Sequence, residues 1–218
     1  MKTLFTTNRK KDIFLAILLT LFIISFAVVF TVFFKQLYYF DIDYLGISQS
    51  TGLSKDIIIE NYNILIQYQS LFYRGELNLP DFIMSTTGRI HFEEVKRIFD
   101  IIQILCITTG VLSAIMVYQN HKDKEYRYLK LTTYFSIGIP TILGFLASID
   151  FDKAFVIFHK IAFRNDYWIF DSAVDPVITI LPEAFFMHCF MLIIVIVIVM
   201  SLICFGIYRK KEREIIKH

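Results

Sequence analysis

The chain has 218 residues, of which 56% are hydrophobic, and its mean hydropathy is +0.58. A soluble domain of this length carries more charge, because polar surface must cover its core, so the composition excludes an ordinary soluble protein and indicates a membrane protein. A net charge of only +2 argues against nucleic-acid binding, and 8 glycines with 4 prolines exclude a collagen-like or linker-rich chain.

Four apolar segments are long enough to cross a bilayer, which needs about 20 residues. They cover about residues 13–34, 99–118, 131–149 and 184–207. The basic start of the chain resembles a signal peptide, but the first apolar segment continues to Phe34, past the small-residue site Ser25-Phe26-Ala27. Secretory apolar regions are shorter, about 7–15 residues, so we predict an uncleaved first span. We expect an all-α membrane protein with four transmembrane helices in a single membrane domain, residues 1–218.

Lysine and arginine indicate the orientation of these spans. Residues 1–12 hold four of them, including Lys2, residues 119–130 hold four, including Lys124, and residues 208–218 hold five, including Lys217. The two long connections, residues 35–98 and 150–183, hold the other nine. Because short basic segments stay in the cytoplasm, we predict that both termini are cytoplasmic (N-in/C-in) and that the long connections form an extracytoplasmic cap.

The first long connection begins with Tyr38 to Phe40, placed where an aromatic belt is expected. Ser54 suits the N-cap of an amphipathic helix over residues 55–73, whose apolar positions recur at helical spacing. For residues 74–89 we expect a loop with a short hairpin. A helix should begin near His91 and continue into the second span.

The second long connection contains a helical stripe of aromatic residues, which predicts a helix in the membrane interface, formed by Phe151, Phe155, Phe158 and Ala162. His159 lies beside this stripe. Asn165-Asp166 is typical of a turn. Pro182 and Glu183 suit the start of the fourth span, because proline and a negative charge are favourable in the first turn of a helix.

Two outward histidines, His91 and His159, together with five acidic residues between positions 150 and 182, form a candidate acid–base site. The alternative is that each histidine is a hydrogen-bonded packing residue and the acids form a solvated face; residue types alone do not decide. His188 lies inside the fourth span, where an ionisable residue is a functional candidate by default. We expect it to be neutral and paired with a hydroxyl or carbonyl group.

The sequence contains no HExxH, GxSxG, P-loop or GxGxxG motif. Its cysteines lie far apart in apolar segments without CxxC spacing, so we expect packing roles for Cys106, Cys189 and Cys204. No ligand spacing supports a metal site built from the histidines, and no serine or cysteine lies in a recognisable nucleophile motif. We therefore expect neither a metal nor another cofactor, and an attacking group that belongs to the substrate.

The chain resembles a family of four-span bacterial membrane proteins, the lipoprotein intramolecular transacylase family, Lit. The resemblance rests on Phe158-His159-Lys160-Ile161-Ala162-Phe163-Arg164-Asn165-Asp166-Tyr167-Trp168, on Asp175-Pro176, and on Leu181-Pro182-Glu183-Ala184-Phe185-Phe186. A second match is His91-Phe92-Glu93-Glu94-Val95-Lys96. There Phe92 and Glu94 replace the methionine and aspartate of the family pattern His-Met-x-Asp-Val-Lys. The four-span layout agrees as well.

The resemblance implies an acyltransferase that moves the sn-2 acyl chain of a diacylglyceryl lipoprotein to the α-amino group of its N-terminal cysteine, giving a lyso-form lipoprotein. It implies no cofactor and no nucleic acid. The partners would be diacylglyceryl lipoproteins and membrane lipid, and the site would lie on the extracytoplasmic side of the bacterial cytoplasmic membrane. Transfer within one molecule needs no protein nucleophile, which agrees with the motifs above.

For this chemistry we expect His159 to be the base and His91 its acid–base partner or an oxyanion donor, an assignment that the sequence leaves open. Supporting groups are expected to be Asp150, Asn165, Asp166, Trp168 and Glu94. A second group of candidates contains His188, Glu183 and Asp175, of which Glu183 and Asp175 would stabilise the entry to the fourth span.

Two alternatives stay open at this point. An interfacial lipid or peptide hydrolase would be favoured by sensitivity to chelators. A non-enzymatic membrane subunit with an extracytoplasmic binding cap would tolerate alanine at both His91 and His159. The sequence selects no particular lipoprotein, acyl length or oligomeric state.

Overall fold

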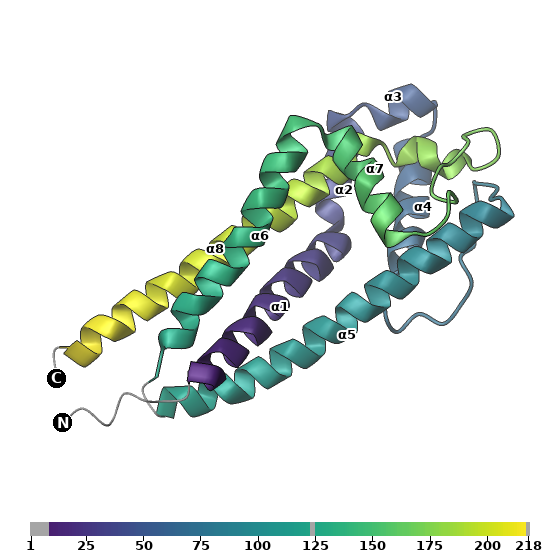
Figure 1. Cartoon of the computed structure of the whole chain (residues 1–218). Coiled ribbons are helices and arrows are strands. Elements are labelled where there is room, and N and C mark those ends of the chain that lie inside the picture. The colour runs from purple at the N-terminus through teal and green to yellow at the C-terminus, as the bar shows by residue number, and fades with distance from the viewer. Residues whose placement is uncertain (1–8, 123–124, 217–218) are drawn as a thin grey trace. The chain divides into compact units, whose positions relative to one another are not determined.

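A computed structural model describes residues 9–122 and 125–216, with only the backbone at positions 139, 146 and 148. Throughout these residues the regular structure is helical, which confirms the predicted all-α class (Figure 1). The helices are α1 (Arg9–Phe33), α2 (Lys35–Tyr44), α3 (Ile47–Thr51), α4 (Lys55–Tyr68), α5 (Thr86–Lys122), α6 (Arg127–Ile149), α7 (Phe151–Ala162), the 3-10 helix η1 (Pro176–Ile180) and α8 (Glu183–Ile216). Lys2, Lys124 and Lys217, used above to predict the orientation, lie outside the described residues.

Three helices, α1, α5 and α8, are long and apolar enough to cross a membrane. In the most apolar part of α5 and of α8 only 11% of the residues are buried, so these helices present apolar side chains outward, as helices solvated by lipid do. The predicted third span coincides with α6, which has 23 residues and contains Pro140. The four-span layout and its orientation stay predictions.

The described residues fall into two compact units. The first lies within Met1–Val28, Ile104–Gly144 and Ile193–His218, and therefore contains segments of α1, α5, α6 and α8. Its polar contacts include the hydroxyl groups of Ser136 and Ser201, which are 2.6 Å apart and buried. Because lipid offers no hydrogen-bond partner, a buried hydroxyl pair of this kind helps to hold neighbouring helices together.

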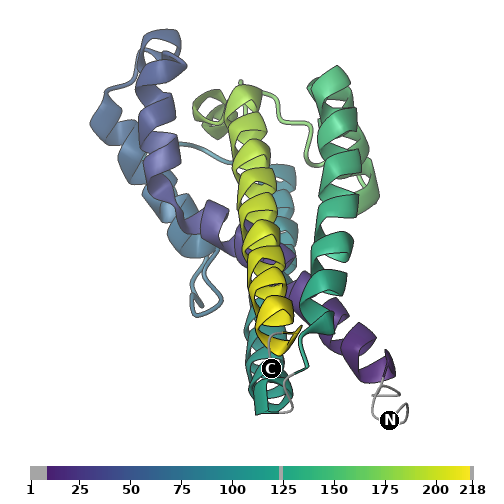
Figure 2. The same cartoon turned by 90° about the vertical axis from the view of Figure 1, so that its left-hand side faces the viewer.

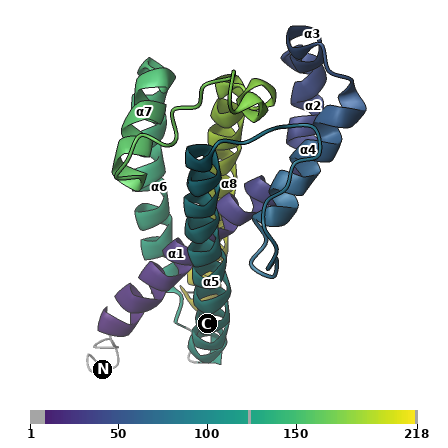
Figure 3. The same ribbon diagram turned by 90° about the vertical axis from the view of Figure 1, so that its right-hand side faces the viewer.

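The second unit, Val29–Gln103 and Phe145–Leu192, has a core in which aromatic side chains stack. Figures 2 and 3 both show α2, α3 and α4 lying together in this unit. Tyr38 of α2 stacks on Tyr62 of α4 with ring centroids 3.6 Å apart, and its hydroxyl donates to the carbonyl of Ile180 at 2.6 Å. Tyr38 is completely buried, so its assignment to an aromatic belt is wrong: the phenol finds its hydrogen-bond partner inside the protein.

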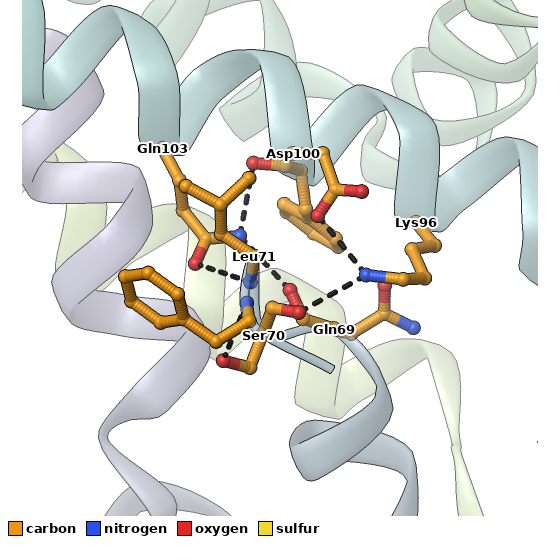
Figure 4. Close-up of polar contacts among 8 residues, drawn as sticks. Gln69, Ser70, Leu71, Lys96, Asp100 and Gln103 are labelled. Atoms are coloured by element: carbon orange, nitrogen blue, oxygen red, sulfur yellow. Dashed lines mark hydrogen bonds and ion pairs between the residues drawn. The ribbon is translucent and has the colours of Figure 1, made fainter. Parts of the chain in front are cut away.

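Helix α4 begins where the sequence predicts, with the Ser54 hydroxyl accepting from the N–H of Ile57, but it ends at Tyr68 rather than near residue 73. The reason lies in α5, whose side chains bind the turn that follows α4 (Figure 4). Lys96 donates to the carbonyl of Ser70 at 3.0 Å, and Gln103 donates to the carbonyl of Gln69 at 2.9 Å. These two bonds hold the chain in a turn at Gln69 and Ser70, just after Tyr68, so the helix does not continue.

Helix α5 begins at Thr86, five residues before the predicted start near His91. Ser85 is the cap that the sequence reading missed, since its hydroxyl accepts from the N–H of Gly88 at 2.9 Å. Residues 74–85 form a loop, as predicted, but the expected short hairpin is wrong because no strand forms in this described segment. The earlier start places His91 inside the helix, where its backbone is fixed.

Candidate active site

Helix α7 carries His159 and forms where the aromatic stripe predicts it. Asp150 is its N-cap, and its carboxylate accepts from the N–H of Lys153 at 2.9 Å. Asp150 was expected to orient or donate at the site, whereas this contact fixes the start of the helix that presents His159. Phe155, one turn before His159, packs its ring against the imidazole with centroids 4.1 Å apart.

The tautomer of His159 follows from one hydrogen bond. Nδ1 lies 2.7 Å from the carbonyl oxygen of Phe155, and since a carbonyl only accepts, Nδ1 carries the proton. In the neutral ring Nε2 therefore has a free lone pair. Partial burial lowers the pKa of His159 below its ordinary value of 6.5, and the smaller effect of the Phe155 hydrogen bond raises it. The neutral, proton-accepting form is thus the main form at neutral pH.

His91, on α5, is the second histidine that the structure brings to this place. Its ring centroid is 6.2 Å from that of His159, and the two planes are inclined by 35°. The rings of Phe163 and Phe170 stand edge-on to it at 4.7 and 5.4 Å, and the residue is only 5% exposed. Among the described residues Nδ1 of His91 has no hydrogen-bond partner. The two imidazoles thus come from segments 68 residues apart in the chain.

The segment after α7 links the two histidines through Asn165. The Asn165 amide donates to Oε1 of Glu94 on α5 at 2.9 Å, and its side-chain oxygen accepts from the N–H of Tyr167 at 3.0 Å. The carbonyl of Asn165 accepts from the indole N–H of Trp168 at 3.0 Å, and the Trp168 ring lies 4.9 Å from that of His159. The predicted turn, Glu94, Asn165 and Trp168 therefore form one connected group at the histidines.

The other predicted residues lie elsewhere or serve the backbone. Asp166 is exposed, and its carbonyl closes the turn by accepting from the N–H of Ile169. Asp175 is 3% exposed, and its carboxylate accepts from the N–H and the hydroxyl of Ser85, both at 2.7 Å. Glu183 is the first residue of α8. Glu183 thus lies at the start of the predicted fourth span, whereas the carboxylate of Asp175 binds the residue before α5 and not the entry to that span.

His188 has a different partner from the one predicted. Its Nδ1 lies 2.8 and 2.9 Å from the two carboxylate oxygens of Asp41 on α2, so the expectation of a hydroxyl or carbonyl partner is wrong. Asp41 is completely buried, and sequence reasoning missed it. The available signal was its helical spacing: Asp41 follows Tyr38 by three residues and precedes Ile42, so all three share the buried face of α2.

Taken together, the groups around His91 and His159 offer proton transfer in an aromatic surrounding. Nε2 of His159 accepts a proton, the neutral ring of His91 carries one N–H that can donate, and low polarity strengthens both interactions. Among the described residues no group of three or more His, Cys, Asp or Glu is placed to hold a metal ion. The fold, with its long apolar helices, and this site define an integral membrane protein with a candidate active site built around two neighbouring histidines.

The chain belongs to the family of the lipoprotein intramolecular transacylase Lit, whose family model matches residues 13–186. It is similar to the in meso structure of the membrane integral lipoprotein intramolecular transacylase Lit from Bacillus cereus, with 38% identity, a TM-score of 0.94, and coverage of 96% of this chain and 98% of that chain. A structure of that protein with a histidine-to-arginine mutation gives 38% identity, a TM-score of 0.85 and coverage of 94% and 92%. A third structure, of that protein with a histidine-to-alanine mutation, gives 37% identity, a TM-score of 0.87 and coverage of 96% of each chain. No curated protein matches the chain.

Family membership confirms the resemblance and makes the protein a lipoprotein intramolecular transacylase, a membrane acyltransferase. The hydrolase and the non-enzymatic subunit are not favoured.

Proposed function

We propose that His91 and His159 together catalyse acyl transfer within one lipoprotein molecule, from the glyceryl sn-2 oxygen to the α-amino group of the N-terminal cysteine. The observation that carries this proposal is the meeting of the two imidazoles, 6.2 Å apart, in a Lit-family chain. They come from two different helices and lie among aromatic side chains. The remaining steps follow from the environment of each ring.

His159 is the general base. As the neutral amine attacks the ester carbonyl, a new N–C bond forms and a proton leaves nitrogen for Nε2 of His159. The bond between carbon and the glyceryl oxygen then breaks, and the same proton moves from Nε2 to that oxygen. Atoms and charge balance without a protein nucleophile. The hydrogen bond from Nδ1 to the Phe155 carbonyl supports this role, because it fixes the ring and stabilises the transient imidazolium.

His91 stabilises the oxyanion. Its neutral ring carries one N–H, and an N–H aimed at the developing negative charge in a site of low polarity lowers the barrier by roughly 3–4 kcal/mol in comparable enzymes. Burial to 5% exposure and the edge-on contacts with Phe163 and Phe170 hold this ring in one orientation. The reverse assignment, with His91 as base, makes a different prediction for the experiment below.

Holding the amine near the ester supplies much of the remaining acceleration, because an intramolecular reaction avoids the entropy cost of bringing two molecules together. Asn165 and Trp168 shape the wall beside His159, and Asp150 fixes the start of its helix. Phe158 and Ile161 of α7 are 58% and 79% exposed, which suits a helix that meets acyl chains.

This function also requires a particular placement. We propose that α6 crosses the membrane as the third of four spans, that both termini are cytoplasmic, and that the histidines face the extracytoplasmic side of the cytoplasmic membrane, where lipoproteins are anchored. In a variant without native cysteines, a membrane-impermeant maleimide added to intact cells should label a cysteine at exposed Glu76 and not one at Lys122. The opposite labelling would reverse the topology.

The function is tested in a bacterium that leaves its lipoproteins diacylated with a free amino terminus. The N-terminal lipopeptide is analysed by mass spectrometry after expression of wild type, His159→Ala, His91→Ala and the control His121→Ala. We expect wild type and the control to move one acyl chain to nitrogen with unchanged total mass, and His159→Ala to lose this. Loss in His91→Ala with substantial activity in His159→Ala would reverse the two roles. An untouched lipopeptide despite normal insertion of wild type would refute the function.

A further inference from the structure

One carboxylate oxygen of Glu94 accepts a hydrogen bond, and the other has no partner among the residues that the structure describes. Oε1 accepts the hydrogen bond from the Asn165 amide at 2.9 Å, which fixes the plane of the carboxylate. Oε2 is buried and has no hydrogen-bond partner among the described residues. Leaving a buried acceptor unpaired costs about 1–3 kcal/mol, more for a charged group, so a carboxylate kept in this state indicates a ligand with a strong donor.

The position of Glu94 relates it to both histidines. It follows His91 by three residues on α5, so the two side chains lie on one face of the helix. Its partner Asn165 belongs to the segment that places Trp168 4.9 Å from the ring of His159. A group bound at Oε2 would therefore lie in the neighbourhood of the reacting centre.

We propose that Glu94 binds the α-ammonium group of the substrate's N-terminal cysteine, an inference that rests on the proposed function. A free α-amino group has a pKa of about 7.7–8.0 and is mainly cationic at neutral pH. It offers three donors, of which one can satisfy Oε2 without disturbing the Asn165 bond. A peptide N–H would satisfy the oxygen but not the charge, and an acyl chain would satisfy neither.

The consequence is selectivity for a free amino terminus. Because the protein covers Oε2, a covering side chain must rotate away when the ammonium binds. The gain is a charge-assisted hydrogen bond in place of an unpaired buried acceptor. The bound ammonium then loses one proton to water before it attacks as a neutral amine. An N-acylated cysteine has no such charge and gains nothing at Glu94.

The test compares Glu94→Gln with Glu93→Gln in the full-length protein. Glutamine at position 94 keeps the shape and an oxygen for the Asn165 amide but removes the charge, and Glu93 is the exposed neighbour that serves as the matched control. The probes are a synthetic diacylglyceryl-cysteine lipopeptide with a free amine and its N-acetylated derivative. Binding of each to protein in lipid nanodiscs is measured, together with KM and kcat for the free amine.

We expect wild type and Glu93→Gln to bind the free amine more tightly than the N-acetylated probe. Glu94→Gln should lose roughly 10- to 100-fold in affinity for the free amine and little for the N-acetylated probe. Equal losses for both probes would indicate a structural role and overturn the proposal, as would an unchanged preference. A wild type that shows the preference but makes no lyso-form product would refute the proposed function and leave the ammonium site standing.

A measurement on wild type alone applies even if Glu94→Gln does not fold. The preference for the free amine should vanish as the pH rises above about 8, where the ammonium deprotonates. A preference that persists unchanged to pH 9.5 would overturn the proposal.

Discussion

The buried pair of Asp41 and His188 makes an asymmetric prediction about stability. Asp41 is completely buried, whereas the His188 side chain is 25% exposed. His188→Ala leaves the carboxylate buried and unpaired, for which the expected loss of folding free energy is about 3–5 kcal/mol. Asp41→Ala leaves an imidazole that is 25% exposed instead of a fully buried carboxylate, so its loss should be smaller, about 1–3 kcal/mol.

These free energies correspond to measurable shifts in Tm, the midpoint of thermal unfolding. For a chain of this length 1 kcal/mol shifts Tm by about 2–4 °C, so His188→Ala should lower Tm by about 6–20 °C and Asp41→Ala by about 2–12 °C. In the double variant the lone buried charge is gone, so its loss should be smaller than the sum of the single losses by about 1–3 kcal/mol. The single tryptophan, Trp168, reports unfolding by its fluorescence in detergent.

The reasoning fails if Asp41→Ala costs as much as His188→Ala. It also fails if the two losses add within about 0.5 kcal/mol, because contacting partners should not be additive. His121→Ala serves as the control, since the contact of that histidine with Tyr126 is exposed, and it should leave Tm nearly unchanged.

Three further predictions concern the site and the segment that supports it. Burial lowers the pKa of His159, so the loss of transfer caused by protonating this base should appear only below pH 6.5, whereas above that pH transfer should follow deprotonation of the substrate amine, whose pKa is about 7.7–8.0. Since the unfolded chain binds the His159 proton more tightly, stability from this group should also fall as the pH drops below 6.5, which a pH series of Tm for wild type and His159→Ala would check. Asn165→Ala removes two side-chain hydrogen bonds and should slow transfer about 10- to 100-fold while moving the fluorescence maximum of Trp168, and an unchanged spectrum would contradict its positioning role. Asp175→Ala breaks both bonds to Ser85 and should cost about 2–4 kcal/mol in thermal unfolding, whereas Asp171→Ala, at an exposed position, should cost far less.

Local patterns in the sequence predict local structure well in this chain. The apolar segments predict the long helices, and the cap at Ser54 follows from residue type and position. The stripe of aromatic residues predicts α7, with His159 beside it. In each case residues within one or two helical turns determine the outcome, so the information is present in a short window.

Contacts between distant segments are what the sequence could not provide. Asp41 meets a histidine 147 positions later, and Ser85 meets Asp175 across 90 positions. Helical spacing could place Asp41 on the same face of α2 as Tyr38 and Ile42, but no periodicity encodes its pairing with His188. The early end of α4 has the same origin, since the groups that bind the two carbonyls just after it, Lys96 and Gln103, lie on α5.

Two buried polar atoms at the histidine site lower the stability of the fold, and a role in function explains them better than a role in packing. Nδ1 of His91 and Oε2 of Glu94 lie three residues apart on one helix, both buried and both without a hydrogen-bond partner among the described residues. Each costs about 1–3 kcal/mol, and apolar side chains of similar shape would remove that cost. A position that only packed the core would have no use for two unpaired polar atoms beside aromatic rings. Their presence is explained if a substrate supplies the missing partners, an oxyanion or its precursor for the imidazole and a cation for the carboxylate, so that the free energy withheld from folding is recovered on binding.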